Sequence, residues 1–152
     1  MTTSSPMDAP IPGHAGLHLL LVEDSSGDAD LIQARLRVGS GAGCTVCWVD
    51  RFAAAADKLQ AGEVDAVLLD LNLPDSEGID TVLGIRRVAP FVPIVVLTGN
   101  ADHEMGLAAV HAGAQEFLAK GEATADLLWR VLRYAIERQR AREHFRQSEQ
   151  FL

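Results

Sequence analysis

The chain has 152 residues, 48% hydrophobic and 22% charged, a size and composition that fit one globular domain with additions at its ends. Its formal net charge of −8 disfavours direct binding of nucleic acid by the chain as a whole, and no apolar run approaches the length of a membrane span. The N-terminus holds Ser, Thr, Pro and Gly without the basic and apolar regions of a secretion signal, so we expect residues 1–16 to be a disordered leader.

Short apolar runs then alternate with amphipathic stretches. The pattern predicts strands at residues 17–22, 45–49, 66–69, 94–97 and 116–118, and helices at 28–38, 52–61, 78–88, 102–112 and from 125 onward. A five-fold β-α repeat predicts an α/β fold, a doubly wound five-stranded parallel sheet with helices on both faces. The continuous apolar runs of the middle strands fit strands that are covered on both sides.

The C-terminal segment continues beyond the length of a compact fifth helix. Residues 125–150 contain no Gly or Pro, and we expect the helix to run past Arg138. Its sparse heptad, with Val131 and Phe145 in one column, is too polar for a strong coiled coil by itself. We therefore expect residues 138–152 to be a solvated helical extension or a linker to an output domain, with dimerisation as an alternative.

Two cysteines, Cys44 and Cys47, match the C-x-x-C spacing of redox and metal motifs. The β-branched and aromatic residues around them favour a strand, in which residues three apart point to opposite faces. We expect two small hydrophobic residues with free thiols and no redox or zinc function.

Polar residues directly follow the predicted strands. The carboxyl ends of parallel strands meet at one edge of a sheet, and ligands bind there at the switch point. The residues expected at this edge are Glu23 and Asp24 after the first strand, Asp70 and Asn72 after the third, Thr98 after the fourth and Lys120 after the fifth.

Clustered carboxylates repel one another, and a hard divalent cation removes that repulsion. Mg²⁺ prefers oxygen ligands and is commonly held by one or two carboxylates together with phosphate oxygens. Lys120 adds a positive charge and Thr98 a hydroxyl, which suit a phosphoryl group in transfer. A carboxylate such as Asp70 can itself be the nucleophile and form an aspartyl-phosphate.

Four motifs in this order resemble the receiver domain of two-component response regulators, over residues 17–137. They are Leu-Leu-Val-Glu-Asp at 20–24, Leu-Leu-Asp-Leu-Asn-Leu-Pro at 68–74, Val-Pro-Ile-Val-Val-Leu-Thr-Gly at 92–99 and Gly-Ala-Gln-Glu-Phe-Leu-Ala-Lys at 113–120. The resemblance implies a flavodoxin-like sheet and a Mg²⁺ site. In that site Asp24 and Asp70 match direct metal ligands, the backbone carbonyl of Asn72 matches a third, and Glu23 matches a carboxylate that acts through metal-bound water.

The resemblance also implies roles around the phosphoryl group. Asp70 matches the phosphoacceptor, Lys120 the lysine that pairs with the phosphoryl group, Thr98 the switch hydroxyl and Phe117 the aromatic switch residue. One departure is Gly121, which follows Lys120 where many members carry a proline, often in a cis linkage that we do not expect here. Phe117 lacks the hydroxyl of the tyrosine in some members, so it can signal only through packing.

The implied function is a cytoplasmic signalling switch that catalyses only its own phosphorylation and dephosphorylation. Its implied partners are a sensor histidine kinase or phosphotransfer protein as donor, a covalently linked output domain and a second copy in a homodimer. Three alternatives remain open at this point. A phosphatase of the haloacid-dehalogenase type needs a second Asp where Asn72 stands, a flavodoxin needs a phosphate-binding loop where Glu23 and Asp24 would repel phosphate, and a pseudo-receiver would have lost part of the set.

Overall fold

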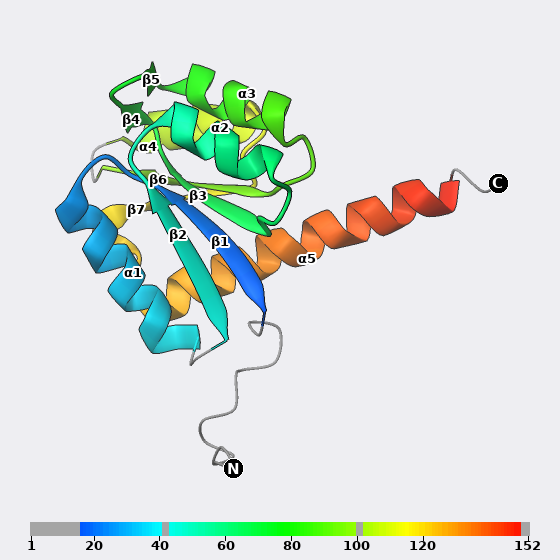
Figure 1. Ribbon diagram of the computed structural model, residues 1–152, viewed down its shortest axis with the longest axis horizontal. Helices are drawn as coiled ribbons and strands as arrows, with labels where there is room; N and C mark the ends of the chain where they lie inside the picture. The colour runs from blue at the N-terminus through cyan, green and yellow to red at the C-terminus, as the bar shows by residue number, and fades with distance from the viewer. Residues whose placement is uncertain (1–15, 41–42, 100–101, 150–152) are drawn as a thin grey trace, which may run out of the picture.

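The computed structural model describes residues 16–40, 43–99 and 102–149, so the expected leader lies outside the described residues except for Gly16. Strands and helices alternate along the chain as predicted (Figure 1). The elements are β1 (Leu17–Val22), α1 (Ser26–Ser40), β2 (Cys44–Val49), α2 (Phe52–Gln60), β3 (Ala66–Asp70), β4 (Asn72–Leu73), β5 (Ser76–Glu77), α3 (Ile79–Val88), β6 (Ile94–Thr98), α4 (His103–His111), β7 (Glu116–Ala119), the 3₁₀ turn η1 (Lys120–Glu122) and α5 (Ala125–Glu149).

Five parallel strands form the main sheet in the order β2-β1-β3-β6-β7. The chain moves outward from β1 to β2 and then crosses to β3 on the other side, so the switch point falls between β1 and β3. Val22 pairs with Leu69 across this point, which brings the next residues, Glu23 and Asp70, side by side. This parallel sheet confirms the predicted fold class.

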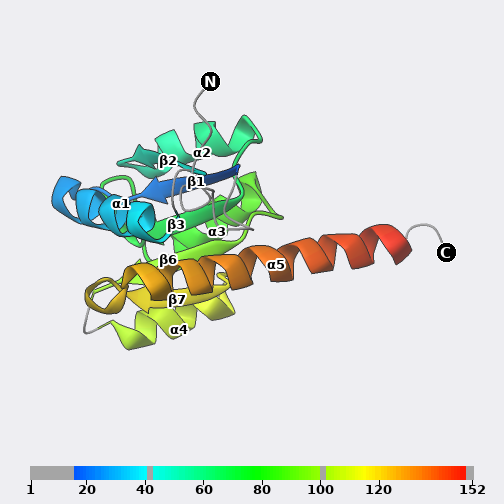
Figure 2. The same ribbon diagram turned by 90° about the horizontal axis from the view of Figure 1, so that it is seen from below.

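The alternating side chains of β1 feed two separate cores. Leu19 and Leu21 face α1 and α5, whereas Leu20 and Val22 face the layer of α2, α3 and α4. All four side chains are almost completely buried, and burying each of them contributes roughly 1.5–3 kcal/mol. Figures 1 and 2 show the resulting three layers, with the sheet between the two sets of helices.

The two cysteines divide in the same way. Cys44 packs against the core under α1 and α5, and Cys47 packs against the opposite core, so the prediction of opposite faces is confirmed. Both thiols are free.

A short hairpin of β4 and β5, which the sequence pattern did not predict, follows β3. Asp75 in its turn accepts the backbone N–H of Phe52 at 2.8 Å and of Ala53 at 3.0 Å. These are donors of the first turn of α2 that have no partner within that helix. The hairpin is thereby attached to the start of α2 and sets the course of the chain just after Asp70.

Helix α5 has 25 residues, and its continuation past Arg138 confirms the predicted extension (Figures 1 and 2). Its first half packs against the sheet, with Leu128 and Leu132 fully buried. Its second half is mostly exposed, although the Arg146 guanidinium lies 4.4 Å from the centre of the Phe91 ring. None of the described helices is both long and apolar enough to cross a membrane.

Candidate functional site

Three carboxylates meet at the carboxyl edge of the sheet. Glu23 and Asp24 directly follow β1 and Asp70 ends β3, and one oxygen from each lies within 4.8 Å of the others. Glu23 is fully buried, Asp70 is 7% exposed and Asp24 is exposed. The predicted convergence of these residues is confirmed, and the cluster opens to solvent on the side of Asp24.

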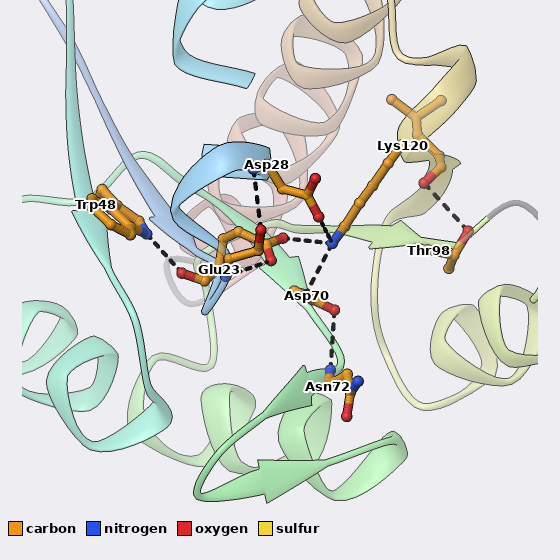
Figure 3. A network of polar contacts seen from close by, with 9 residues as sticks. Glu23, Asp28, Trp48, Asp70, Asn72, Thr98 and Lys120 are labelled. Atoms are coloured by element: carbon orange, nitrogen blue, oxygen red, sulfur yellow. Dashed lines mark hydrogen bonds and ion pairs between the residues drawn. The ribbon is translucent and has the colours of Figure 1, made fainter. Parts of the chain in front are cut away.

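Lys120 reaches into this cluster from the start of η1. Its Nζ lies 2.8 Å from Glu23 Oε2, 3.0 Å from Asp28 Oδ2 and 3.1 Å from Asp70 Oδ2 (Figure 3). Burial opposes the charge on Lys120, but these three carboxylates together hold its pKa above the ordinary value. Asp24 lies close to Glu23 and Asp70, so the site contains four carboxylates and one ammonium and keeps an excess of negative charge.

Glu23 experiences this excess most strongly. Its Oε1 accepts the backbone N–H of Ser25 at 3.2 Å, whereas its buried Oε2 accepts no hydrogen bond and has the close ion pair with Lys120. Burial, followed by the contact with the Asp70 carboxyl group, raises the pKa of Glu23 to about 7. A buried carboxylate oxygen without a hydrogen bond fits a site that can bind a small divalent cation with oxygen ligands.

Both carboxylate oxygens of Asp70 have partners. The backbone N–H of Asn72 donates to Oδ1 at 3.1 Å, and Lys120 donates to Oδ2 (Figure 3). These two contacts fix the carboxylate at the rim of an open hollow of about 430 Å³, which Asn72, Thr98 and Met105 also line. The site therefore offers a held carboxylate with space beside it for a group the size of phosphate.

Thr98 ends β6 on the other side of this hollow. Its hydroxyl donates to the carbonyl of Leu118 on β7 at 3.4 Å, a long hydrogen bond, and within the described part of the chain no hydrogen bond joins it to Asp70. The sequence placed Thr98 at the correct edge, and the structure adds that its hydroxyl is turned towards β7.

Phe117 is half-buried on β7, next to α4. Its ring meets the imidazole of His103 edge-on, with 5.2 Å between the ring centres. The ring also occupies the space beside Gly106, where a Cβ atom would overlap it. The position of this ring therefore depends on a glycine in the middle of α4.

Sequence reasoning missed two contributors to the site. Asp28 lies in the first turn of α1, where an acidic residue suits the helix dipole, and it also pairs with Lys120. Trp48 on the edge strand β2 donates its indole N–H to the backbone carbonyl of Glu23 at 2.7 Å (Figure 3). Neither contact has a sequence signal, because Asp is common in first turns and Trp is common in strands.

The sequence of this chain is similar to those of known proteins. The response regulator receiver domain matches residues 19–132. The swarming motility regulation protein RssB of Serratia marcescens is 38% identical over 115 residues, which cover 76% of this chain and 51% of RssB. The cell cycle transcriptional regulator CtrA of Caulobacter vibrioides is 29% identical, over 76% of this chain and 48% of CtrA. The chain thus spans about half the length of these two relatives.

Solved structures agree with this match. The receiver domain of the sensor histidine kinase PA1611 of Pseudomonas aeruginosa, described with a magnesium ion coordinated in its active site cleft, has a TM-score of 0.69 and 32% identity over 81% of this chain and 99% of its own. A putative response regulator of Chloroflexus aurantiacus has a TM-score of 0.67 and 28% identity over 76% of this chain and 97% of its own. The phosphatase and flavodoxin alternatives are thereby set aside, and the chain belongs to the response regulator receiver domain family.

Proposed function

We propose that Asp70 accepts a phosphoryl group from a phosphohistidine of a sensor kinase or of a phosphotransfer protein. In this step a carboxylate oxygen of Asp70 bonds to phosphorus, the P–N bond of the donor breaks, and its electron pair stays with the imidazole. The observation that carries the proposal is the arrangement of Asp70, held by Lys120 and the Asn72 N–H at the rim of an open hollow. The product is an aspartyl-phosphate in a domain that acts as a signalling switch.

The acidic cluster supports a requirement for Mg²⁺. Asp24, Asp70 and the backbone carbonyl of Asn72 would hold the ion directly, and Glu23 would hold it through water. When bound, the ion neutralises charge on the transferring phosphoryl oxygens. The buried Oε2 of Glu23, which has an ion pair with Lys120 but accepts no hydrogen bond, and the magnesium-bound PA1611 receiver domain both favour this assignment.

Two side chains are suited to respond to the phosphoryl group. Lys120 would exchange part of its contact with the carboxylates for a charge-assisted hydrogen bond to a phosphoryl oxygen. Thr98 would exchange its long hydrogen bond to Leu118 for a shorter one to the same group, which costs little because the present bond is weak. Phe117 would then repack against α4 and so alter the surface formed by α4, β7 and α5.

The proposed output signal requires residues outside the receiver fold. RssB and CtrA are about twice the matched length, and we propose that here too a longer protein carries an output region, joined through the exposed second half of α5. A homodimer formed through the altered surface is a second way to transmit the switch.

Labelling with acetyl phosphate in the presence of Mg²⁺ tests the phosphoacceptor. We expect a hydroxylamine-sensitive acyl phosphate in the wild-type chain and in Asp57→Asn, a control at an exposed carboxylate on α2. Labelling should disappear in Asp70→Asn and when EDTA removes the metal. Label that persists in Asp70→Asn at the wild-type level would reject the assignment.

A further inference from the structure

The main chain of Lys120 needs a support that its own sequence does not provide. Lys120 begins a single 3₁₀ turn, and the hydrogen bond that closes this turn, from the Ala123 N–H to the Lys120 carbonyl, is 3.4 Å long. Gly121 follows Lys120 and has the largest conformational freedom of any residue. A turn with a long bond and a glycine would leave the Lys120 ammonium free to shift relative to Asp70.

Arg35 provides this support from helix α1. Its Nη1 donates to the carbonyl of Lys120 at 3.0 Å and to the carbonyl of Ala123 at 2.9 Å, so one nitrogen joins both ends of the turn. The three residues are 85 and 88 positions apart in sequence, and Arg35 is half-buried. Hydrogen bonds from a charged donor are about twice as strong as neutral ones.

The same helix also holds the other end of the lysine. Asp28, two helical turns before Arg35 and therefore on the same face of α1, pairs with the Lys120 ammonium at 3.0 Å. The helix is attached in turn to α5, because the indole N–H of the buried Trp129 donates to the carbonyl of Leu36 at 2.9 Å. Lys120 is thus held at its ammonium by Asp28 and at its carbonyl by Arg35, from one fixed element.

We propose that Arg35 is a positioning residue for phosphoryl transfer, which fixes the main chain of Lys120 so that its ammonium stays at Asp70. This inference rests on the proposed function of Asp70. Among the described residues no hydrogen bond or ion pair joins Arg35 to the carboxylates, and Arg35 does not line the hollow, so its effect passes through the turn that carries Lys120. It therefore acts on the rate of transfer at saturating metal, and its loss does not weaken the affinity for Mg²⁺, because a Lys120 ammonium that shifts away from the carboxylates removes a competing positive charge.

The test compares Arg35→Gln with Arg37→Gln on the same helix. Arg37 is exposed, and its Nε donates to the Gln33 carbonyl of its own helix at 3.4 Å, which makes it a matched control. Initial rates of labelling by acetyl phosphate are measured at saturating Mg²⁺, and the dissociation constant for Mg²⁺ is measured separately by titration. We expect Arg35→Gln to lower the maximal rate by about 10- to 100-fold, since a displacement near 1 Å costs up to that much.

In the same variant the dissociation constant for Mg²⁺ should not rise more than about twofold above wild type, and Arg35→Lys, which keeps one charged donor, should recover part of the rate. A maximal rate of Arg35→Gln equal to that of Arg37→Gln overturns the proposal. A rate loss that Arg35→Lys does not reduce, or one that matches the unfolded fraction in a thermal melt, also overturns it, because either result indicates a general structural role. Failure of Asp70→Asn to abolish labelling would instead reject the proposed function.

Discussion

Neutralising Glu23 should stabilise the metal-free protein, although it damages the site. The pKa of Glu23 rises from an ordinary 4.5 to about 7, chiefly through burial. At about 1.36 kcal/mol per pKa unit, the ionised side chain costs the metal-free fold about 3 kcal/mol. Glu23→Gln removes this cost but brings an amide NH₂ next to Lys120, so we expect a net gain of about 1–2 kcal/mol at pH 8.

The gain has a defined pH dependence. The folded-state pKa of Glu23 lies above its unfolded value, so the unfolded chain loses the proton first, and stability falls as the pH rises from 4.5 to about 7. At pH 5 only about 0.8 kcal/mol of this cost remains, which is less than the amide penalty, so Glu23→Gln should be up to about 1 kcal/mol less stable than wild type there and reach its full advantage above pH 7.

Urea unfolding in EDTA at pH 5 and pH 8 measures this difference. Glu63→Gln, at an exposed carboxylate before β3, is the control and should stay within about 0.5 kcal/mol of wild type at both values. Mg²⁺ at about 100 times its dissociation constant should stabilise the wild type by about 2.7 kcal/mol and the Glu23→Gln variant by less. A Glu23→Gln variant that is less stable than wild type in EDTA at pH 8 would refute the buried-charge reasoning.

Two further predictions concern packing and thiol chemistry. Gly106→Ala improves helix propensity by about 1 kcal/mol, but the new Cβ overlaps the Phe117 ring. Urea unfolding should therefore show a net loss of stability of up to about 2 kcal/mol, which disappears in a Phe117→Leu background. A gain of stability in the wild-type background contradicts the contact. Burial and the nearby Asp65 carboxylate raise the pKa of Cys44 to about 11. In a Cys47→Ser background the alkylation rate of Cys44 should therefore rise with a midpoint near pH 11, and Asp65→Asn should lower that midpoint. A midpoint near pH 9 in the Cys47→Ser background contradicts this prediction.

The fold was predictable because short, mainly apolar strands alternate with amphipathic helices, and polar residues stand at or just after the ends of β1, β3, β6 and β7. Strands β3 and β6 include Asp70 and Thr98 as their last residues, so each ends one residue later than the predicted strand. The pairing of neighbouring strands then brings these ends together, so the acidic cluster followed from topology alone. The hairpin of β4 and β5 was missed because strands of two residues leave no period in the sequence.

The supporting contacts could not be predicted for a different reason. Arg35 and Asp28 lie on a helix whose spacing shows which residues share a face, but not which distant turn that face meets. Trp48 looks like any aromatic strand residue until the edge strand is placed beside β1. Contacts between residues 25 to 92 positions apart depend on the assembled fold, whereas the residues that do the proposed chemistry are marked by local sequence.

The charges of the site are arranged so that contacts can be exchanged, and no single strong ion pair dominates. Lys120 is shared among Glu23, Asp28 and Asp70, so no single carboxylate is fully neutralised, and Glu23 retains an oxygen without a hydrogen bond. A lysine committed to one partner would stabilise the resting fold more but would be harder to redirect to a phosphoryl group. The buried Glu23 carboxylate destabilises the fold, and the two apolar cores on either side of the sheet offset this cost. The cores also keep the strand ends in register while the charges at the edge are exchanged.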